Sequence, residues 1–269
     1  MAGSLALEAA VARDRRLVVS AILGLTALSW AYLVWMAGDM SGDMAGEMPG
    51  GTANGMTMPM AMGPAVWTPA YGAMMLIMWV VMMAGMMLPS AMPMILTFAT
   101  IGRRRRDRGQ PHVATAVFVG GYLIAWGGFS VAAVAAQWAL EQAALLSPMM
   151  MSTSPVFGGL LLIAAGIYQF TPLKHACLRH CRSPFDFVLN RWRDGAAGAL
   201  SMGVEHGLYC LGCCWVAMAL LFVFGVMNLL WIAALAILVL LEKAVPGGHR
   251  IAQGAGIFMV AGGVWMLAS

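Results

Sequence analysis

The sequence predicts an all-α membrane protein, a polytopic bundle of about seven transmembrane helices. Of its 269 residues, 61% are hydrophobic and 10% are charged, with a mean hydropathy of +0.82, whereas a soluble domain carries roughly 25% charged residues. Apolar stretches recur at lengths near the roughly 20 residues that cross a bilayer. Lys and Arg are confined to alternate loops between these stretches. This composition excludes soluble, disulfide-rich secreted and disordered proteins. The absence of phosphate-binding or nucleophile motifs also leads us to expect no enzymatic activity.

The expected spans follow from the apolar stretches in chain order. The sixth is short and is separated from the fifth by Gly225 and Asn228 alone, so six spans is the fallback. The first span follows a basic stretch, as the apolar part of a signal peptide does. Unlike a signal peptide, it is long, carries Trp30, Tyr32 and Trp35 at its outer end, and has no small-residue cleavage site after it. We therefore expect it to remain as an anchor. The seven spans are residues 17–37, 69–98, 113–140, 156–170, 197–225, 228–241 and 251–268.

The positive charges predict the orientation. All 15 Lys and Arg precede the first span or follow the second, fourth or sixth, and residues 38–68, 141–155 and 226–227 contain none. The positive-inside rule then places the N-terminus in the cytoplasm and the C-terminus outside, as in a bacterial inner membrane. The net charge of +4 is thus an orientation signal, and no nucleic-acid partner is expected. We divide the chain into a cytoplasmic N-terminus with the first helix (1–37), an exterior Met-rich flexible segment (38–68) and a metal-binding bundle (69–269).

Methionine is unusually common, with 26 residues. Thioether sulfur is a soft, uncharged ligand that suits Cu(I), and it cannot be lost to disulfides in an oxidising exterior. The Met-rich segment is therefore predicted to capture Cu(I) or Ag(I), with Met40, Met44 and Met48 among the ligands. In the alternative, the methionine repeat has no function and arose by drift of a low-complexity sequence. Its methionines are Met36, Met40, Met44, Met48, Met56, Met58, Met60 and Met62.

The second span continues the methionine pattern. Met78, Met82 and Met86 share one helix face with Met74, and Met75, Met83 and Met87 lie beside them. This face predicts a conduit for a soft ion, although methionine also fills ordinary apolar cores. Two prolines, Pro89 and Pro93, predict that the span kinks or opens.

The fifth span holds the sharpest motif. His206, Cys210, Cys213 and Cys214 fall on one side of a helix, and nitrogen with thiolate ligands suits Cu(I) or Zn. Ionisable groups at membrane depth mark functional sites, so Glu205 and His206 are candidates. The alternatives are apolar packing of the cysteines and a redox pair of Cys210 with Cys213.

A second set follows the fourth span on the predicted cytoplasmic side. Cys177 and Cys181 are four residues apart, with His175 and His180 nearby. Two cysteines with adjacent histidines are a moderate metal signal, and the two sets could exchange one ion. In the alternative, the basic residues of this segment only anchor a helix end to lipid head groups. Those residues are Lys174, Arg179 and Arg182.

Other polar and small residues predict packing inside the bundle. Glu242 and Lys243 are interpreted as a paired interfacial anchor, and Gln169, Tyr122 and Asn228 are expected to bond neighbouring helices. Glycine pairs within the spans would let helices approach closely. They are Gly120/Gly121, Gly127/Gly128, Gly158/Gly159, Gly254/Gly256 and Gly262/Gly263.

Four motifs, at residues 78–94, 169–174, 177–184 and 206–215, resemble the bacterial family of predicted metal-binding integral membrane proteins. The resemblance covers roughly residues 70–245. It implies a membrane metal-binding role of unknown mechanism, and the Met repeat lies outside its pattern. The copper assignment comes from ligand softness and not from the resemblance. The motif positions that it carries over are Cys177, Cys181, His206, Cys210, Cys213 and Cys214.

These features together predict a membrane Cu(I) transporter or metallochaperone. The ion would pass from the Met-rich segment along the second span to the His/Cys site and leave by Cys177 and Cys181. A thiolate holds a soft cation more tightly than a thioether does, which favours inward movement. The expected partners are the bilayer, the metal ion (Cu(I), with Zn or Ag(I) as alternatives), and other membrane subunits or a separate metallochaperone. A structural or assembly subunit and a thiol-redox membrane protein are the alternative functions.

Overall fold

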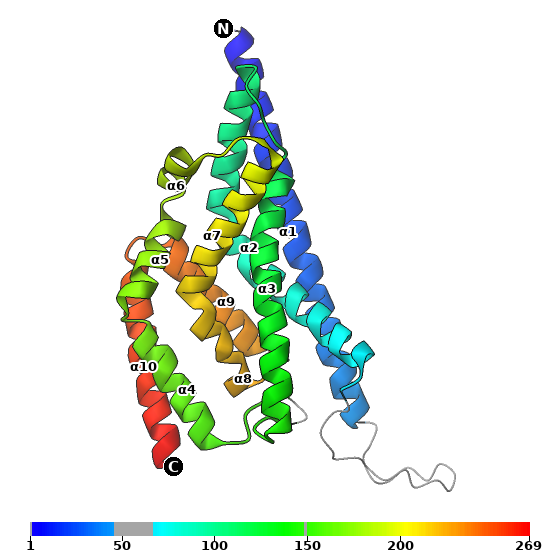
Figure 1. The fold of residues 1–269 in the computed structure, drawn as a ribbon, viewed down its shortest axis with the longest axis vertical. Helices are drawn as coiled ribbons and strands as arrows, with labels where there is room; N and C mark the ends of the chain where they lie inside the picture. The colour runs from blue at the N-terminus through cyan, green and yellow to red at the C-terminus, as the bar shows by residue number, and fades with distance from the viewer. Residues whose placement is uncertain (1, 46–66, 148–149) are drawn as a thin grey trace, which may run out of the picture.

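The computed structural model confirms the all-helical prediction. It describes residues 2–45, 67–147 and 150–269, with the side chains of the first helix described from residue 15 to residue 38, and these residues form helices and no strand. Figure 1 shows the N-terminus and the C-terminus at opposite ends of the long axis. The helices are α1 (Ala2–Ala45), α2 (Pro69–Asp107), α3 (Thr115–Gln142), α4 (Pro155–Tyr168), α5 (Pro172–Arg182), α6 (Pro184–Arg191), α7 (Gly195–Ala219), α8 (Leu221–Phe224), α9 (Leu229–Ala244) and α10 (Gly248–Ala268).

Fewer helices than predicted are long enough to cross a membrane. Five described segments qualify by length and composition, in α1, α2, α3, α7 with α8, and α10. A sixth is reached if α4 and α5, which meet at a bend of 62°, count as one broken span. Seven spans are therefore not confirmed. The shortfall has a physical reason, because the 14 residues of α4 and the 16 of α9 rise only about 21 to 24 Å.

The break between the fifth and sixth apolar stretches lies where the sequence predicted it. The helical run ends at Phe224, and Gly225 follows with a φ of 97°, a conformation that glycine adopts without steric cost. Asn228 then caps α9, its side chain accepting the backbone N–H of Leu230 at 3.2 Å.

Close helix approaches occur at about half of the predicted glycines. A side chain on Gly121 would collide with the Leu200 carbonyl, and one on Gly203 with the Phe118 carbonyl, so α3 and α7 touch backbone to backbone. Gly159 and Gly263 make the same contact between α4 and α10. Gly158 and Gly256 are also tightly packed, whereas the positions that face open space are Gly120, Gly127, Gly128, Gly254 and Gly262.

The predicted opening at the two prolines of α2 is not observed. α2 remains helical through Pro89 and Pro93, although it changes direction along its length (Figure 1). Hydroxyl groups contact the carbonyls near the prolines: the Ser90 hydroxyl donates to the Met87 carbonyl at 2.9 Å, and the Tyr122 hydroxyl donates to it at 3.2 Å. The carbonyls that lose a backbone donor to Pro89 and Pro93 are those of Gly85 and Pro89, four residues earlier, and these hydroxyl contacts do not replace those donors.

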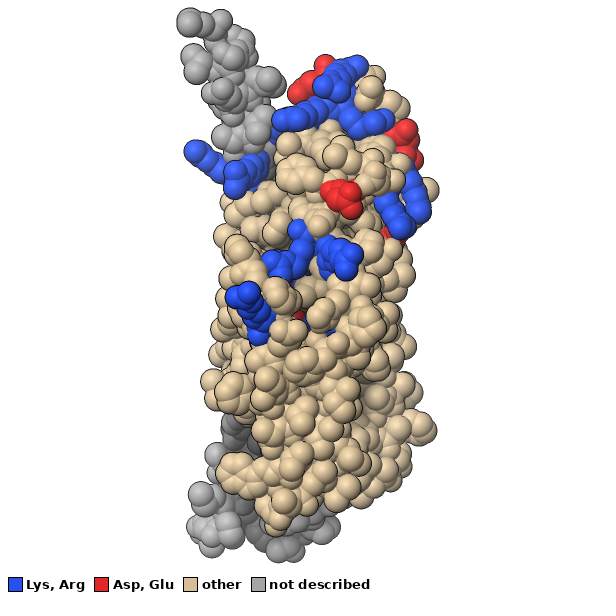
Figure 2. All heavy atoms as spheres, turned by 90° about the vertical axis from the view of Figure 1, so that its left-hand side faces the viewer, with Lys and Arg blue, Asp and Glu red and all other residues tan. Residues whose placement is uncertain are grey.

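The basic residues gather at one end of the molecule. On the face shown in Figure 2, Lys and Arg cover the upper part, and the lower part carries no charge. Two of the predicted loop cations do not belong to this surface, because Lys174 and Lys243 are buried. We call the other end, where α3 ends and α2 begins, the uncharged end.

Most of the predicted Met-rich segment lies outside the described residues, including Met48. α1 extends to Ala45, so the backbone around Met40 and Met44 is helical where the sequence predicted a flexible chain. The side chains of Met40 and Met44 are likewise outside the described part, and their predicted role as ligands stays a prediction.

Candidate metal centre

The cysteine-bearing face of α7 is buried in the centre of the bundle. His206, Cys210, Cys213 and Cys214 are each at most 2% exposed. The thiols of Cys213 and Cys214 both donate to the Cys210 carbonyl at 3.0 Å. Three sulfurs are therefore held within a little more than one helical turn.

Helix α5 brings the second cysteine set onto this face. The Cys181 thiol lies near the thiols of Cys210 and Cys213, close enough for the three groups to interact electrostatically. Cys177 packs over Gly212, where an added Cβ would lie 2.7 Å from its sulfur. All five cysteines of the chain are free thiols. We call Cys181, Cys210, Cys213 and Cys214 the thiol cluster.

Cys210 has a polar environment that the sequence did not predict. The Lys243 ammonium group lies 2.8 Å from its sulfur and 3.1 Å from the Ser90 hydroxyl. The Tyr122 hydroxyl lies 3.1 Å from the same sulfur, which confirms the expected bonding of Tyr122 to a neighbouring helix. A cation in contact with a sulfur favours a negative charge on that sulfur.

The expected pairing of Glu242 with Lys243 is wrong. Glu242 instead pairs with Lys174 at 2.7 Å, and Lys174 also bonds the Gln169 side chain. All of these groups are buried, so Lys174 does not anchor a helix end to head groups either. The bend between α4 and α5 turns Lys174 inward toward α9, where buried ions must find partners.

Of the candidate residues His175, His180, Glu205 and His206, only the last lies in the buried centre of the bundle, and the other three lie at its periphery. The buried His206 ring lies 5.8 Å from the Tyr122 ring, and its Nδ1 atom has no hydrogen-bond partner among the described residues. His175 and His180 instead contact backbone carbonyls of their own segment. Glu205 pairs with two arginines at the end of α6 and just after it. Among these four described residues, His206 is therefore the one that offers an unpartnered nitrogen near the thiol cluster.

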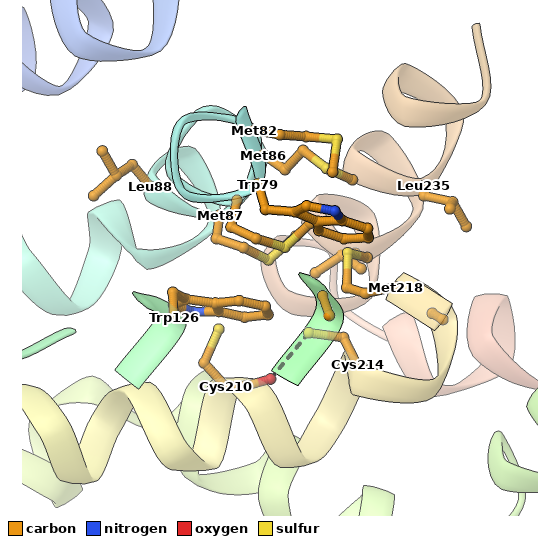
Figure 3. Close-up of a cluster of buried hydrophobic side chains, with 14 of the residues drawn as sticks. Trp79, Met82, Met86, Met87, Leu88, Trp126, Cys210, Cys214, Met218 and Leu235 are labelled. Carbon is orange, nitrogen blue, oxygen red and sulfur yellow. Dashed lines mark hydrogen bonds between the residues drawn. The ribbon is translucent and has the colours of Figure 1, made fainter. Parts of the chain in front are cut away.

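The buried methionines of α2 surround Trp79 in the core next to the thiol cluster. Figure 3 shows Met87, with Met218 of α7, on the side of Trp79 that faces Cys210 and Cys214, and Met82 and Met86 on its other side. Met74 is 44% exposed and does not belong to this row, whereas the sequence placed it on the same face. We call the buried side chains of Met75, Met78, Met82, Met83, Met86 and Met87 the methionine row.

The thiols and His206 do not form a ready-made metal site. Within the described ranges, no three His, Cys, Asp or Glu side chains are placed so that they could hold an ion. The reason lies in the contacts above, since the thiols of Cys213 and Cys214 point to a carbonyl and the sulfur of Cys210 contacts Lys243. The predicted ligand roles of these residues stay predictions.

Two contributors to this region were missed from the sequence. Met218 is far along α7 from Met202, the other methionine of this helix, so no methionine pattern marks it. Lys243 was detectable, because a lysine at the end of an apolar helix is an intramembrane ion by default. Because Lys243 was expected to pair with Glu242 at the membrane–water interface, it was not recognised as a buried ion.

Comparison with known proteins identifies the family. Residues 76–266 match the family model of PpoB2, described as a copper chaperone. The chain belongs to this copper-chaperone family. The match supports the link to copper that ligand softness predicted, without fixing the oxidation state, and it does not bear on the membrane part of the resemblance. No curated protein and no solved structure matches the chain. The match begins within the methionine row and includes the whole thiol cluster, but it excludes the Met-rich segment.

Proposed function

We propose that this copper chaperone works within the membrane and passes Cu(I) along the methionine row to the thiol cluster. The observation that carries the proposal is the buried cluster in Figure 3, where Met87 of α2 and Met218 of α7 lie between Trp79 and the cysteines Cys210 and Cys214. The functional proposal extends the family assignment, which concerns copper handling in general.

The ligand chemistry supports a soft monovalent ion. Thioethers and thiols select Cu(I), and by the same softness Ag(I), over hard cations. Zn would require four nitrogen, sulfur or oxygen ligands in a tetrahedron, and the described residues offer no group of three. Two or three soft sulfurs are enough to pass a monovalent ion from one residue to the next.

Delivery requires the thiols to turn. Cys213 and Cys214 must leave the Cys210 carbonyl, and Lys243 must give way at the Cys210 sulfur. His206 then adds its unpartnered nitrogen, and Cys177 lies on the route toward the basic end. We propose that the ion leaves there, on the cytoplasmic side of a bacterial inner membrane, to a metallochaperone or another membrane subunit.

The burial of the thiols disfavours the redox alternative. A thiol-redox protein needs a cysteine that its substrate can reach, whereas Cys210 and Cys213 are at most 1% exposed. We therefore propose ion delivery without a catalytic step. No contact of the described residues specifically favours a purely structural subunit.

Copper retention by the detergent-purified full chain tests this proposal. The protein is loaded with Cu(I) under reducing conditions, passed over a desalting column and measured by elemental analysis. The double variant Cys210→Ser/Cys213→Ser should lose most of the retained copper, whereas Met74→Leu, at an exposed methionine, should retain it. An unchanged copper content in the double variant would discredit the thiol cluster.

A further inference from the structure

Glu141 is a buried carboxylate at the uncharged end of the bundle. It lies in the last turn of α3 and accepts hydrogen bonds from Trp67 Nε1 at 2.7 Å and from Gln137 Nε2 at 2.9 Å. No Lys, Arg or His among the described residues forms an ion pair with it. A buried carboxylate without a countercharge is costly, and a bound cation would offset that cost.

The contacts of Glu141 join two sets of methionines. Trp67 follows Met62, the last methionine of the Met-rich segment, by five residues. A fully extended chain of that length reaches at most about 18 Å. On the other side, Gln137 contacts the Met75 sulfur at 3.6 Å and accepts a hydrogen bond from Trp79 at 2.9 Å. The carboxylate thus lies beside the first sulfur of the methionine row.

We propose that Glu141 and Met75 form an entry site for a monovalent soft cation, Cu(I) or Ag(I), at the mouth of the methionine row. The carboxylate attracts the positive charge, and the Met75 thioether supplies the first soft ligand. Gln137 is a positioning residue, because its amide contacts both groups. One carboxylate with one thioether is too few oxygens for Ca²⁺ or Mg²⁺, so the site favours a soft ion in transit. This inference rests on the proposed function.

The entry site predicts an effect on the rate of loading and not on the final metal content. Ag(I) is mixed with the detergent-solubilised full chain at low ionic strength, and tryptophan quenching is followed by stopped flow. Glu141→Gln should slow loading about tenfold, the lower range expected for lost electrostatic attraction, and should reach the wild-type silver content. Glu205→Gln, which removes a carboxylate at the basic end, should load at the wild-type rate.

Glu141→Asp separates charge from structure. It keeps the charge but shortens the side chain and weakens the contacts with Trp67 and Gln137, whereas Glu141→Gln keeps the length. An electrostatic entry site predicts that Asp loads nearly as fast as wild type and that Gln is slow. The reverse order would show a merely structural role and overturn the entry site, and so would wild-type loading by both variants.

The outcome also separates this inference from the proposed function. If Cys210→Ser/Cys213→Ser loses silver while Glu141→Gln loads at the wild-type rate, only the entry site fails. If the wild-type protein retains no silver, the delivery route fails, and the entry site fails with it.

Discussion

Lys174 and Lys243 show how far a residue's surroundings can depart from its position in the sequence. Both follow apolar stretches, where the positive-inside rule counts them with the loop arginines. In the structure, each is buried against a partner on another helix, Glu242 for Lys174 and Cys210 for Lys243. Sequence alone could not pair them, because the Lys174 pair depends on the bend between α4 and α5 and the Lys243 contact on the packing of α9 near α7.

The Lys174–Glu242 pair should contribute strongly to stability. Glu242→Gln leaves the Lys174 ammonium buried without its countercharge, a change that costs about 3–5 kcal/mol. Asp194→Asn breaks the more exposed pair with Arg105 and should cost less than about 1 kcal/mol. Thermal unfolding in one detergent, followed by tryptophan fluorescence, compares the two. Equal small shifts of the melting temperature would show that the buried pair carries no such energy.

At the scale of helices, local signals were reliable and contacts between helices were not. The break at Gly225 and the cap at Asn228 follow from backbone conformation and side-chain chemistry within a few residues. The bend after α4 and the placing of Cys181 beside Cys210 depend on packing between distant segments. The glycine pairs predicted close contacts between helices, but only some of these glycines make such a contact. The sequence does not tell which member of a pair faces a neighbouring helix.

The contact between α3 and α7 gives a prediction at this scale. An alanine at Gly203 would place its Cβ against the Phe118 carbonyl, and overpacking of this kind costs about 1–3 kcal/mol. Gly120→Ala enters open space on α3 and should be neutral or stabilising by up to about 1 kcal/mol. Urea or heat unfolding of both purified variants measures the difference. A Gly203→Ala protein as stable as Gly120→Ala would contradict the packing of these helices.

Over the whole molecule, charge and sulfur are arranged along one axis. The basic residues gather at one end (Figure 2), and Glu141 lies at the other, with the methionine row and the thiol cluster between them. Composition predicted the helical class, and ligand softness predicted the link to copper that the family match supports, whereas the ligand roles of the cluster residues stay predictions. Composition could not predict the number of spans, because α4 and α9 are apolar but short.

The orientation can be tested with reporter fusions. The termini lie at opposite ends of the molecule (Figure 1), and we expect a cytoplasmic N-terminus and an exterior C-terminus. Alkaline phosphatase fused after Ser269 should then be active, and a fluorescent protein fused before Met1 should fluoresce. An inactive phosphatase at the C-terminus would place both termini on one side and require an even number of crossings.

The most direct test is X-ray absorption spectroscopy of the Cu(I)-loaded full chain. Transfer from thioethers to thiols predicts a copper environment of sulfur ligands, with His206 as the sole nitrogen donor, and a clear loss of sulfur scattering in Cys210→Ser. A spectrum dominated by oxygen and nitrogen, or one that Cys210→Ser leaves unchanged, would contradict copper binding at the thiol cluster.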